Sequence, residues 1–134
     1  METTRSQRWR ERRALWARDL TVVDPKAYSV DVIDHDVARA FIAKHHYLPS
    51  YPAARVATGL FGRNAALEGV AVFAVPTTNA VITRHTGFDD PERGCVLARL
   101  ILTDAVPQNG ESFFVARAFR HLRRERPHID AVVS

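Results

Sequence analysis

Hydrophobic and polar residues alternate with two different periods along this chain, and the change of period predicts both strands and helices. Residues 29–33 alternate in the manner of a short, half-buried strand. Residues 37–46 instead carry apolar side chains three and four positions apart, which predicts an amphipathic helix. Val37, Phe41 and Ile42 are expected to face the core from this helix.

The centre of the chain is predicted to form antiparallel strands. Residues 55–62 and 66–75 are two strand-like runs on either side of Gly62-Arg63-Asn64, a pattern that predicts a hairpin. Residues 76–94 are polar and are expected to form a loop. An apolar run over residues 95–103, interrupted by Arg99, predicts a fourth strand.

A second long helix is predicted over residues 111–126, and residues 129–133 are expected to begin a fifth strand. The side chains expected on the buried face of this helix are Phe114, Val115, Ala118, Phe119 and Leu122. Hairpins give antiparallel neighbours, whereas strand–helix–strand crossovers give parallel ones. The order of elements therefore predicts an α/β fold with a mixed central sheet. An exposed apolar strand at a chain end invites aggregation, so we expect the sequence to be C-terminally incomplete.

Residues 1–28 are predicted to form a basic arm or helix that is separate from a domain of residues 29–134. Six arginines crowd this stretch, and Trp9 and Trp16 are seven residues apart, on one side of a helix. Two interpretations stay open. The arm either lies on nucleic acid with its indoles available to stack, or docks its tryptophan stripe on the core.

The composition is that of a soluble globular domain, with 46% hydrophobic and 25% charged residues among 134. No apolar run is long enough to span a membrane, and the N-terminus lacks a signal core, so we expect a cytoplasmic protein. Cys95 is the single cysteine, which excludes an internal disulfide and fits a small core residue. The net charge of +4 comes almost wholly from arginine. Arginine favours phosphate partners, although a preference for arginine codons explains the same bias.

The junction between the fourth strand and the second long helix is the first candidate site. A helix N-terminus presents free N–H groups and a positive dipole end, which together suit a phosphate group. Gly110 is expected to let an anion approach, Asn109 to cap the helix, and Ser112 to add a hydroxyl. Glu111 opposes an anion unless its side chain points away. An ordinary capped helix remains the alternative interpretation.

The path from residue 29 to residue 134 resembles the first two-thirds of the GNAT acyltransferase fold. In that fold the corresponding strand, loop and helix hold acyl-coenzyme A. The loop here, Pro107-Gln108-Asn109-Gly110-Glu111-Ser112, keeps the middle glycine but has Pro107 in place of the usual basic or amide residue.

A narrower resemblance is to the Mom family of phage-type DNA-modifying proteins, which are divergent GNAT members. The stretches that carry this resemblance are His45-His46-Tyr47, Leu97-Ala98-Arg99-Leu100 and the run of residues 104–114. The resemblance implies transfer of a methylcarbamoyl group to the exocyclic amine of adenine in DNA, which protects the DNA from restriction. It also implies DNA as partner, iron, an acyl-coenzyme A-type donor, and donor binding by Gln108, Asn109, Gly110, Glu111 and Ser112.

Four polar residues are the catalytic candidates. His46 would accept a proton or bind a metal, and Tyr47 would donate a proton or stack on an extruded base. Two histidines at a helix end are also expected simply to cap it. Arg99 must pair within its apolar strand, with Asp104 or Glu111, or else bind phosphate in a cleft. Asp104, at the strand end, would orient His46, bind iron or pair with Arg99.

The second long helix carries five arginines and one histidine between residues 117 and 126. These residues form either a solvated basic face or a surface that contacts DNA phosphates. Two other functions compete with DNA modification: a conventional N-acyltransferase acting on a small amine or a protein amine, and a non-catalytic nucleic-acid-binding remnant.

Overall fold

The computed structural model describes residues 23–45, 50–107 and 109–134. Within these ranges it contains five strands, three α-helices and one short 3-10 helix. They are β1 (Ser29–Val32), α2 (His35–His45), β2 (Ala54–Phe61), β3 (Leu67–Ala74), α3 (Asn79–Thr86), η1 (Pro91–Arg93), β4 (Gly94–Leu102), α4 (Gly110–Glu125) and β5 (Ala131–Val133). The predicted N-terminal arm with Trp9 and Trp16 lies mostly outside the described residues. None of the described helices has the length and apolar character needed to cross a lipid bilayer.

The strands form one sheet in the order β1-β2-β3-β4-β5. The first four strands are antiparallel to their neighbours, and β5 runs parallel to β4. The prediction of an α/β fold with a mixed sheet is thus confirmed, and the arrangement is consistent with a GNAT-like fold. β5 pairs with β4 only over Gly94–Val96, so the rest of β4 has no strand on that side among the described residues.

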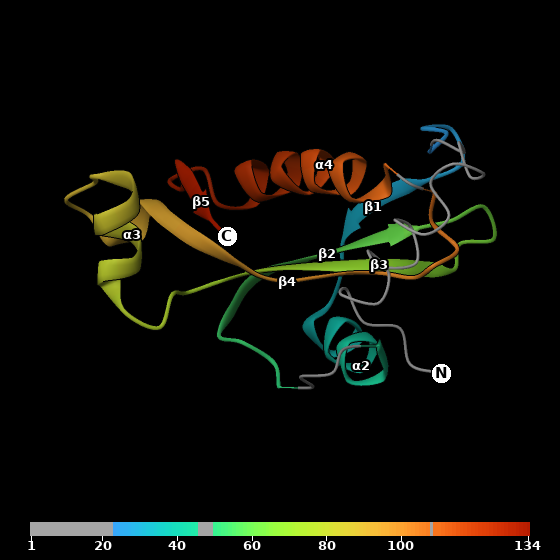
Figure 1. Cartoon of the computed structure of the whole chain (residues 1–134), viewed down its shortest axis with the longest axis horizontal. Coiled ribbons are helices and arrows are strands. Elements are labelled where there is room, and N and C mark those ends of the chain that lie inside the picture. Colours follow the sequence, from blue (N-terminus) through green and yellow to red (C-terminus); the bar gives the residue numbers. More distant parts are fainter. Residues whose placement is uncertain (1–22, 46–49, 108) are drawn as a thin grey trace, which may run out of the picture.

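The two long helices cover opposite faces of the sheet, α2 on one and α4 on the other (Figure 1). The core under α4 includes Phe73, Phe114 and Leu122, and the core under α2 includes Ile42 and Val72. Strand residues alternate between these cores because successive side chains of a strand point to opposite faces. Burial on both faces explains why the central strands are mostly apolar.

The expected loop over residues 76–94 was wrong, because this stretch contains the helix α3. Thr78 precedes the helix in an extended conformation, and Gly87 ends it with a φ of 75°, which few other residues adopt readily. Ile82 is fully buried and lies against Gly94, where any Cβ would collide with it. One apolar contact of this kind anchors a helix whose other residues are mainly polar, so the hydrophobic pattern gave little sign of it.

Two residues expected in the core are largely exposed. Val37 is 44% exposed, because α2 turns Ala38, Phe41 and Ile42 toward the sheet. Phe119 is 42% exposed, although its ring contacts Phe73 at a centroid distance of 5.8 Å. Phe114, Ala118 and Leu122 are buried as expected, while Val115 is only half-buried. The apolar stripes exist in both helices, but each is narrower than the sequence suggested.

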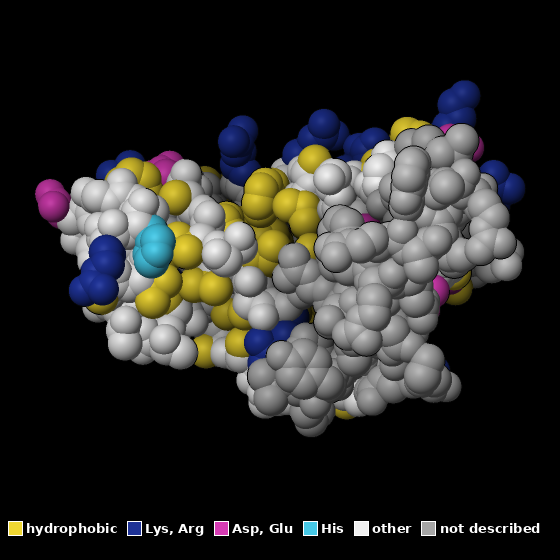
Figure 2. All heavy atoms as spheres, in the orientation of Figure 1, with side chains coloured by type: hydrophobic (Ala, Val, Ile, Leu, Met, Phe, Trp, Pro, Cys, Tyr) yellow, Lys and Arg dark blue, Asp and Glu magenta, His cyan; other side chains and the backbone are white. Residues whose placement is uncertain are grey.

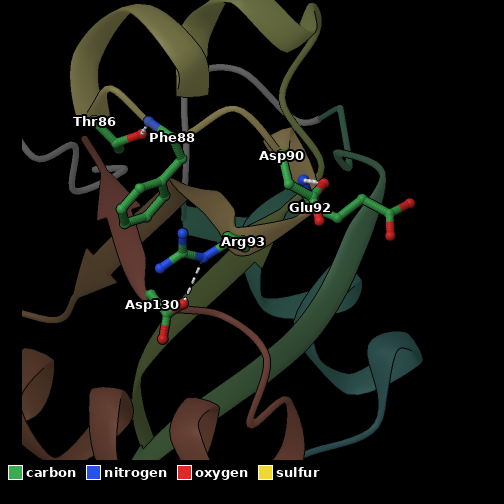
Figure 3. A network of polar contacts seen from close by, with 6 residues as sticks. All are labelled: Thr86, Phe88, Asp90, Glu92, Arg93 and Asp130. Carbon is green, nitrogen blue, oxygen red and sulfur yellow. Dashed lines mark hydrogen bonds and ion pairs between the residues drawn. The ribbon is translucent and has the colours of Figure 1, made fainter.

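A polar network joins the beginnings of β4 and β5 (Figure 3). Arg93 Nε donates to Asp130 Oδ2 at 2.8 Å, and the Asp130 N–H donates to the Arg93 carbonyl at 2.6 Å. The Arg93 guanidinium also lies 4.0 Å from the centre of the Phe88 ring. These contacts hold the segment before β5 against η1, and so support a parallel pairing that is only three residues long.

Candidate functional site

The β4–α4 junction is a tight turn stabilised by its own backbone. The Gly110 N–H donates to the Pro107 carbonyl at 2.9 Å, and the Phe113 N–H donates to the Asn109 carbonyl at 3.2 Å. Asn109 occupies the N-cap position but makes no side-chain cap. Its Oδ1 instead accepts the Val23 N–H at 2.5 Å, across 86 positions of the sequence. The expected capping role of Asn109 was therefore wrong, because its side chain binds the segment before β1.

Gly110 is explained by packing. The residue is buried, and a Cβ there would run into the Val106 side chain and lie 3.2 Å from Leu102 Cδ2. The space beside its Cα is therefore filled by protein, which contradicts the expectation that the missing Cβ leaves room for an anion. Gln108 lies outside the described residues, so donor binding by this loop remains a prediction.

Arg99 extends from β4 on the α2 side of the sheet, opposite Val72. Its guanidinium donates to the Ala98 carbonyl at 2.8 Å, and to the carbonyl and hydroxyl oxygens of Ser50 at 3.0 and 3.2 Å. Its Nε is buried and has no partner among the described residues. The expected pairing with Asp104 or Glu111 is wrong. Arg99 contacts only neutral acceptors in the described part of the chain.

Ser50 and Tyr51 begin the described part of the segment that leads from α2 to β2. The Tyr51 hydroxyl lies 2.8 Å from His35 Nδ1, and the Arg39 guanidinium lies 4.8 Å from the centre of the Tyr51 ring. Burial raises the pKa of Tyr51 above its usual value, and the nearby charge of Arg39 offsets part of that rise. Tyr51 thus remains a neutral phenol near pH 7. Two prolines flank Ser50-Tyr51 and mark this segment in the sequence, but neither residue was predicted as a site residue.

The junction and the Arg99–Ser50 contact lie on different sides of the sheet. Gly110 packs on Leu102 in the core under α4, whereas Arg99 and Ile101 belong to the α2 side. The two places therefore do not share a cleft on one face. β4 lies between the two places. Beyond Val96, the edge of β4 that faces away from β3 has no strand partner within the described ranges.

The remaining candidates are placed only in part. Asp104 is exposed in the turn after β4, and His46 and Tyr47 lie outside the described residues. The described part of the chain contains no group of three histidine, cysteine or carboxylate side chains that could hold a metal ion. Iron therefore remains a prediction, and no described residue is assigned to it. Burial raises the pKa of the Cys95 thiol to about 11, which fits the expected core role.

The family of the chain follows from comparison with known proteins. A model of the Mom protein family matches residues 27–134. The chain belongs to this family. The Mom match spans the described domain and all nine candidate site residues, including the three whose placement the structure leaves out. No curated protein matches the chain.

Five of the six described candidate residues of this Mom domain lie in two separate places. Asn109, Gly110, Glu111 and Ser112 form one turn at the start of α4. Arg99 lies across the sheet from them, bound to Ser50. His46 and Tyr47 precede Ser50 by four and three positions, so the segment that Arg99 holds is continuous with the catalytic candidates.

Proposed function

We propose that this protein modifies DNA, transferring a methylcarbamoyl-type group to the exocyclic amine of adenine and thereby protecting DNA from restriction. Membership of the Mom family carries this proposal, since the family match covers residues 27–134. The adenine amine is paired inside the duplex, so the base has to be extruded before it can react.

Arg99 is proposed to bind an anionic part of the donor and to position the catalytic segment. Its half-buried charge contacts only neutral oxygens among the described residues, and its Nε is unsatisfied. A partly buried charge that contacts only neutral oxygens among the described residues favours an anion beside it. The two hydrogen bonds to Ser50 would at the same time fix the start of the segment that follows His46 and Tyr47.

His46 is proposed to act as general base. In transfer from a carbonyl donor, the adenine nitrogen forms a bond to the carbonyl carbon and the bond to the leaving group breaks. The amine proton passes to the neutral imidazole of His46. Tyr47 would protonate the leaving group or stack on the extruded base, and Asp104 would orient the imidazole. An acyl-coenzyme A-type donor and iron belong to this proposal through the family resemblance, and no step is assigned to iron.

Nucleoside analysis tests the proposal directly. DNA from cells that express the protein is digested to nucleosides and examined by mass spectrometry for modified adenine. Loss of a general base lowers rates by about 100- to 10,000-fold, so His46→Ala should abolish detectable modification. Arg99→Lys keeps the charge but loses the guanidinium group that contacts both Ser50 and Ala98, and should lower the yield strongly. Arg84→Lys on α3 is the matched control because its side chain is exposed and belongs to a different element of the fold.

The same experiment separates the competing functions. Unmodified adenine with folded, iron-loaded protein would contradict DNA modification. Tight binding of acetyl-coenzyme A without affinity for DNA would instead indicate a conventional N-acyltransferase. A protein that binds DNA, binds no donor and forms no modified adenine would indicate a non-catalytic nucleic-acid-binding protein.

A further inference from the structure

A basic groove between α4 and β1 is separate from both places described above. Its volume is about 360 Å³. It is lined by Pro25, Tyr28, Ser29, Val30, Arg117, Arg120, His121 and Arg124. Half of these residues are basic and none is acidic. A groove of this kind attracts anions and repels cations.

The three arginines lie along one side of α4. Arg117, Arg120 and Arg124 are spaced by three and four residues, which is the spacing of neighbours on a helix surface. At 1.5 Å per residue they extend over about 10 Å of the helix axis. Basic side chains project along the α4 side of the molecule (Figure 2). One strand of a DNA duplex places a phosphate about every 3.4 Å along its axis, so about three phosphates fit this length.

The wall of the groove is held in place by a cation–π contact, an aromatic contact and a hydrogen bond. The Arg117 guanidinium lies 4.4 Å from the centre of the Phe113 ring, and Phe113 meets the Tyr28 ring edge-on at 6.4 Å. His121 Nε2 lies 2.7 Å from the carbonyl of Val30, an acceptor, so this nitrogen carries the proton. This bond ties α4 to β1 and satisfies a carbonyl of an edge strand.

We infer that the α4–β1 groove binds the sugar–phosphate backbone of double-stranded DNA, an inference that rests on the proposed function. Arginine recognises phosphate with two parallel hydrogen bonds, and such contacts fix a duplex without reading its sequence. The groove lies at the β1 edge on the α4 side, whereas Arg99 lies on the α2 side of β4. The groove therefore holds duplex away from the reacting base and contributes affinity, with no role in the chemical step.

The test compares the full chain with two triple variants, using a fluorescently labelled duplex DNA and fluorescence anisotropy at about 50 and 200 mM salt. The groove variant is R117Q/R120Q/R124Q. The control R84Q/R123Q/R126Q removes the same charge from exposed positions that do not line the groove. Each phosphate contact contributes a slope of about 0.9 to the salt dependence of affinity, so the groove variant should lose about 2.7. When the salt concentration is raised fourfold, the affinity of the wild-type protein for DNA should fall about 40-fold more than that of the groove variant.

Equal affinity and equal salt slope for the groove variant and the control would overturn the inference. So would a groove variant that loses binding to duplex RNA but retains binding to duplex DNA. The double variant R120Q/R124Q keeps the contact of Arg117 with Phe113 and should reduce the salt slope by about 1.8. A loss graded in this way with the number of arginines removed would not result from misfolding. Failure of the proposed function would give a different result. The groove would still bind DNA in a salt-dependent manner, but the nucleoside analysis would find no modified adenine.

Discussion

Replacement of Gly110 by alanine is expected to destabilise the protein by about 2 kcal/mol. The backbone of Gly110 is not in the left-handed region, so the cost arises from the new methyl group, which would run into Val106 and approach Leu102. Val106 is 2% exposed, and its β-branched side chain has few alternative rotamers. Overpacking of this severity costs about 3 kcal/mol, from which the helix preference of alanine over glycine removes about 1 kcal/mol.

A double-mutant cycle with Val106→Ala isolates this contact. Val106→Ala alone removes two methyl groups from a buried site, which costs about 2 kcal/mol including the cavity. In the double variant the methyl group introduced at position 110 enters the space that the valine side chain vacates. The two losses should therefore not add to about 4 kcal/mol, and the coupling should be about 2 kcal/mol in favour of the double variant.

Urea unfolding followed by circular dichroism measures all four proteins under the same conditions. Gly110→Ala with unchanged or increased stability, or losses that simply add, would refute the packing explanation. If Gly110→Ala also lost donor binding while its stability was unchanged, the glycine would instead serve the close approach of an anion. The cycle thus tests the packing role of this residue without knowledge of the donor, whereas a role in anion binding is tested by the donor-binding measurement.

Two further predictions concern the buried thiol of Cys95 and the ion pair between Arg93 and Asp130. Cys95, whose pKa burial raises from 9.0 to about 11, should not react with a thiol reagent at about pH 8 until urea unfolds the chain. The pKa of the thiol is higher in the folded protein than in the unfolded protein. The neutral thiol therefore contributes its full stability below about pH 9, and this contribution is lost as the pH rises through about 11. Cys95→Ala should lack this pH dependence. Asp130→Asn should cost less than about 1 kcal/mol in urea unfolding, because the ion pair with Arg93 is half-exposed. Arg93→Ala also loses the contact with Phe88 and should cost more, and an equal loss for both variants would exclude a contribution from the ring.

The elements that the hydrophobic pattern predicted correctly are those whose apolar positions repeat over several turns or strand residues. α4 and the β2–β3 hairpin are of this kind. α3 was missed because one buried side chain, Ile82, anchors it, and a single buried apolar residue gives no clear period. Val37 and Phe119 were placed in the core because both continue an apolar stripe, although the sheet covers only part of each helix.

The candidate site was predictable in composition but not in geometry. The sequence indicated that Arg99, within an apolar strand, needs polar partners. It did not indicate that Ser50, 49 positions earlier, provides them. In the same way the glycine of the junction was recognised as special, but the reason lies in Val106, whose side chain meets it only after the turn has formed.

The order of the strands and of the two long helices, the mixed sheet and the family were determined by the sequence itself, because periodicity and local motifs are properties of neighbouring residues. The tertiary structure decided which polar groups face each other. It placed α2 and α4 on opposite faces of the sheet, bound Arg99 to neutral oxygens, and brought three arginines of α4 beside β1. These relations depend on how distant segments pack, and packing is fixed only when the whole chain buries its apolar surface together.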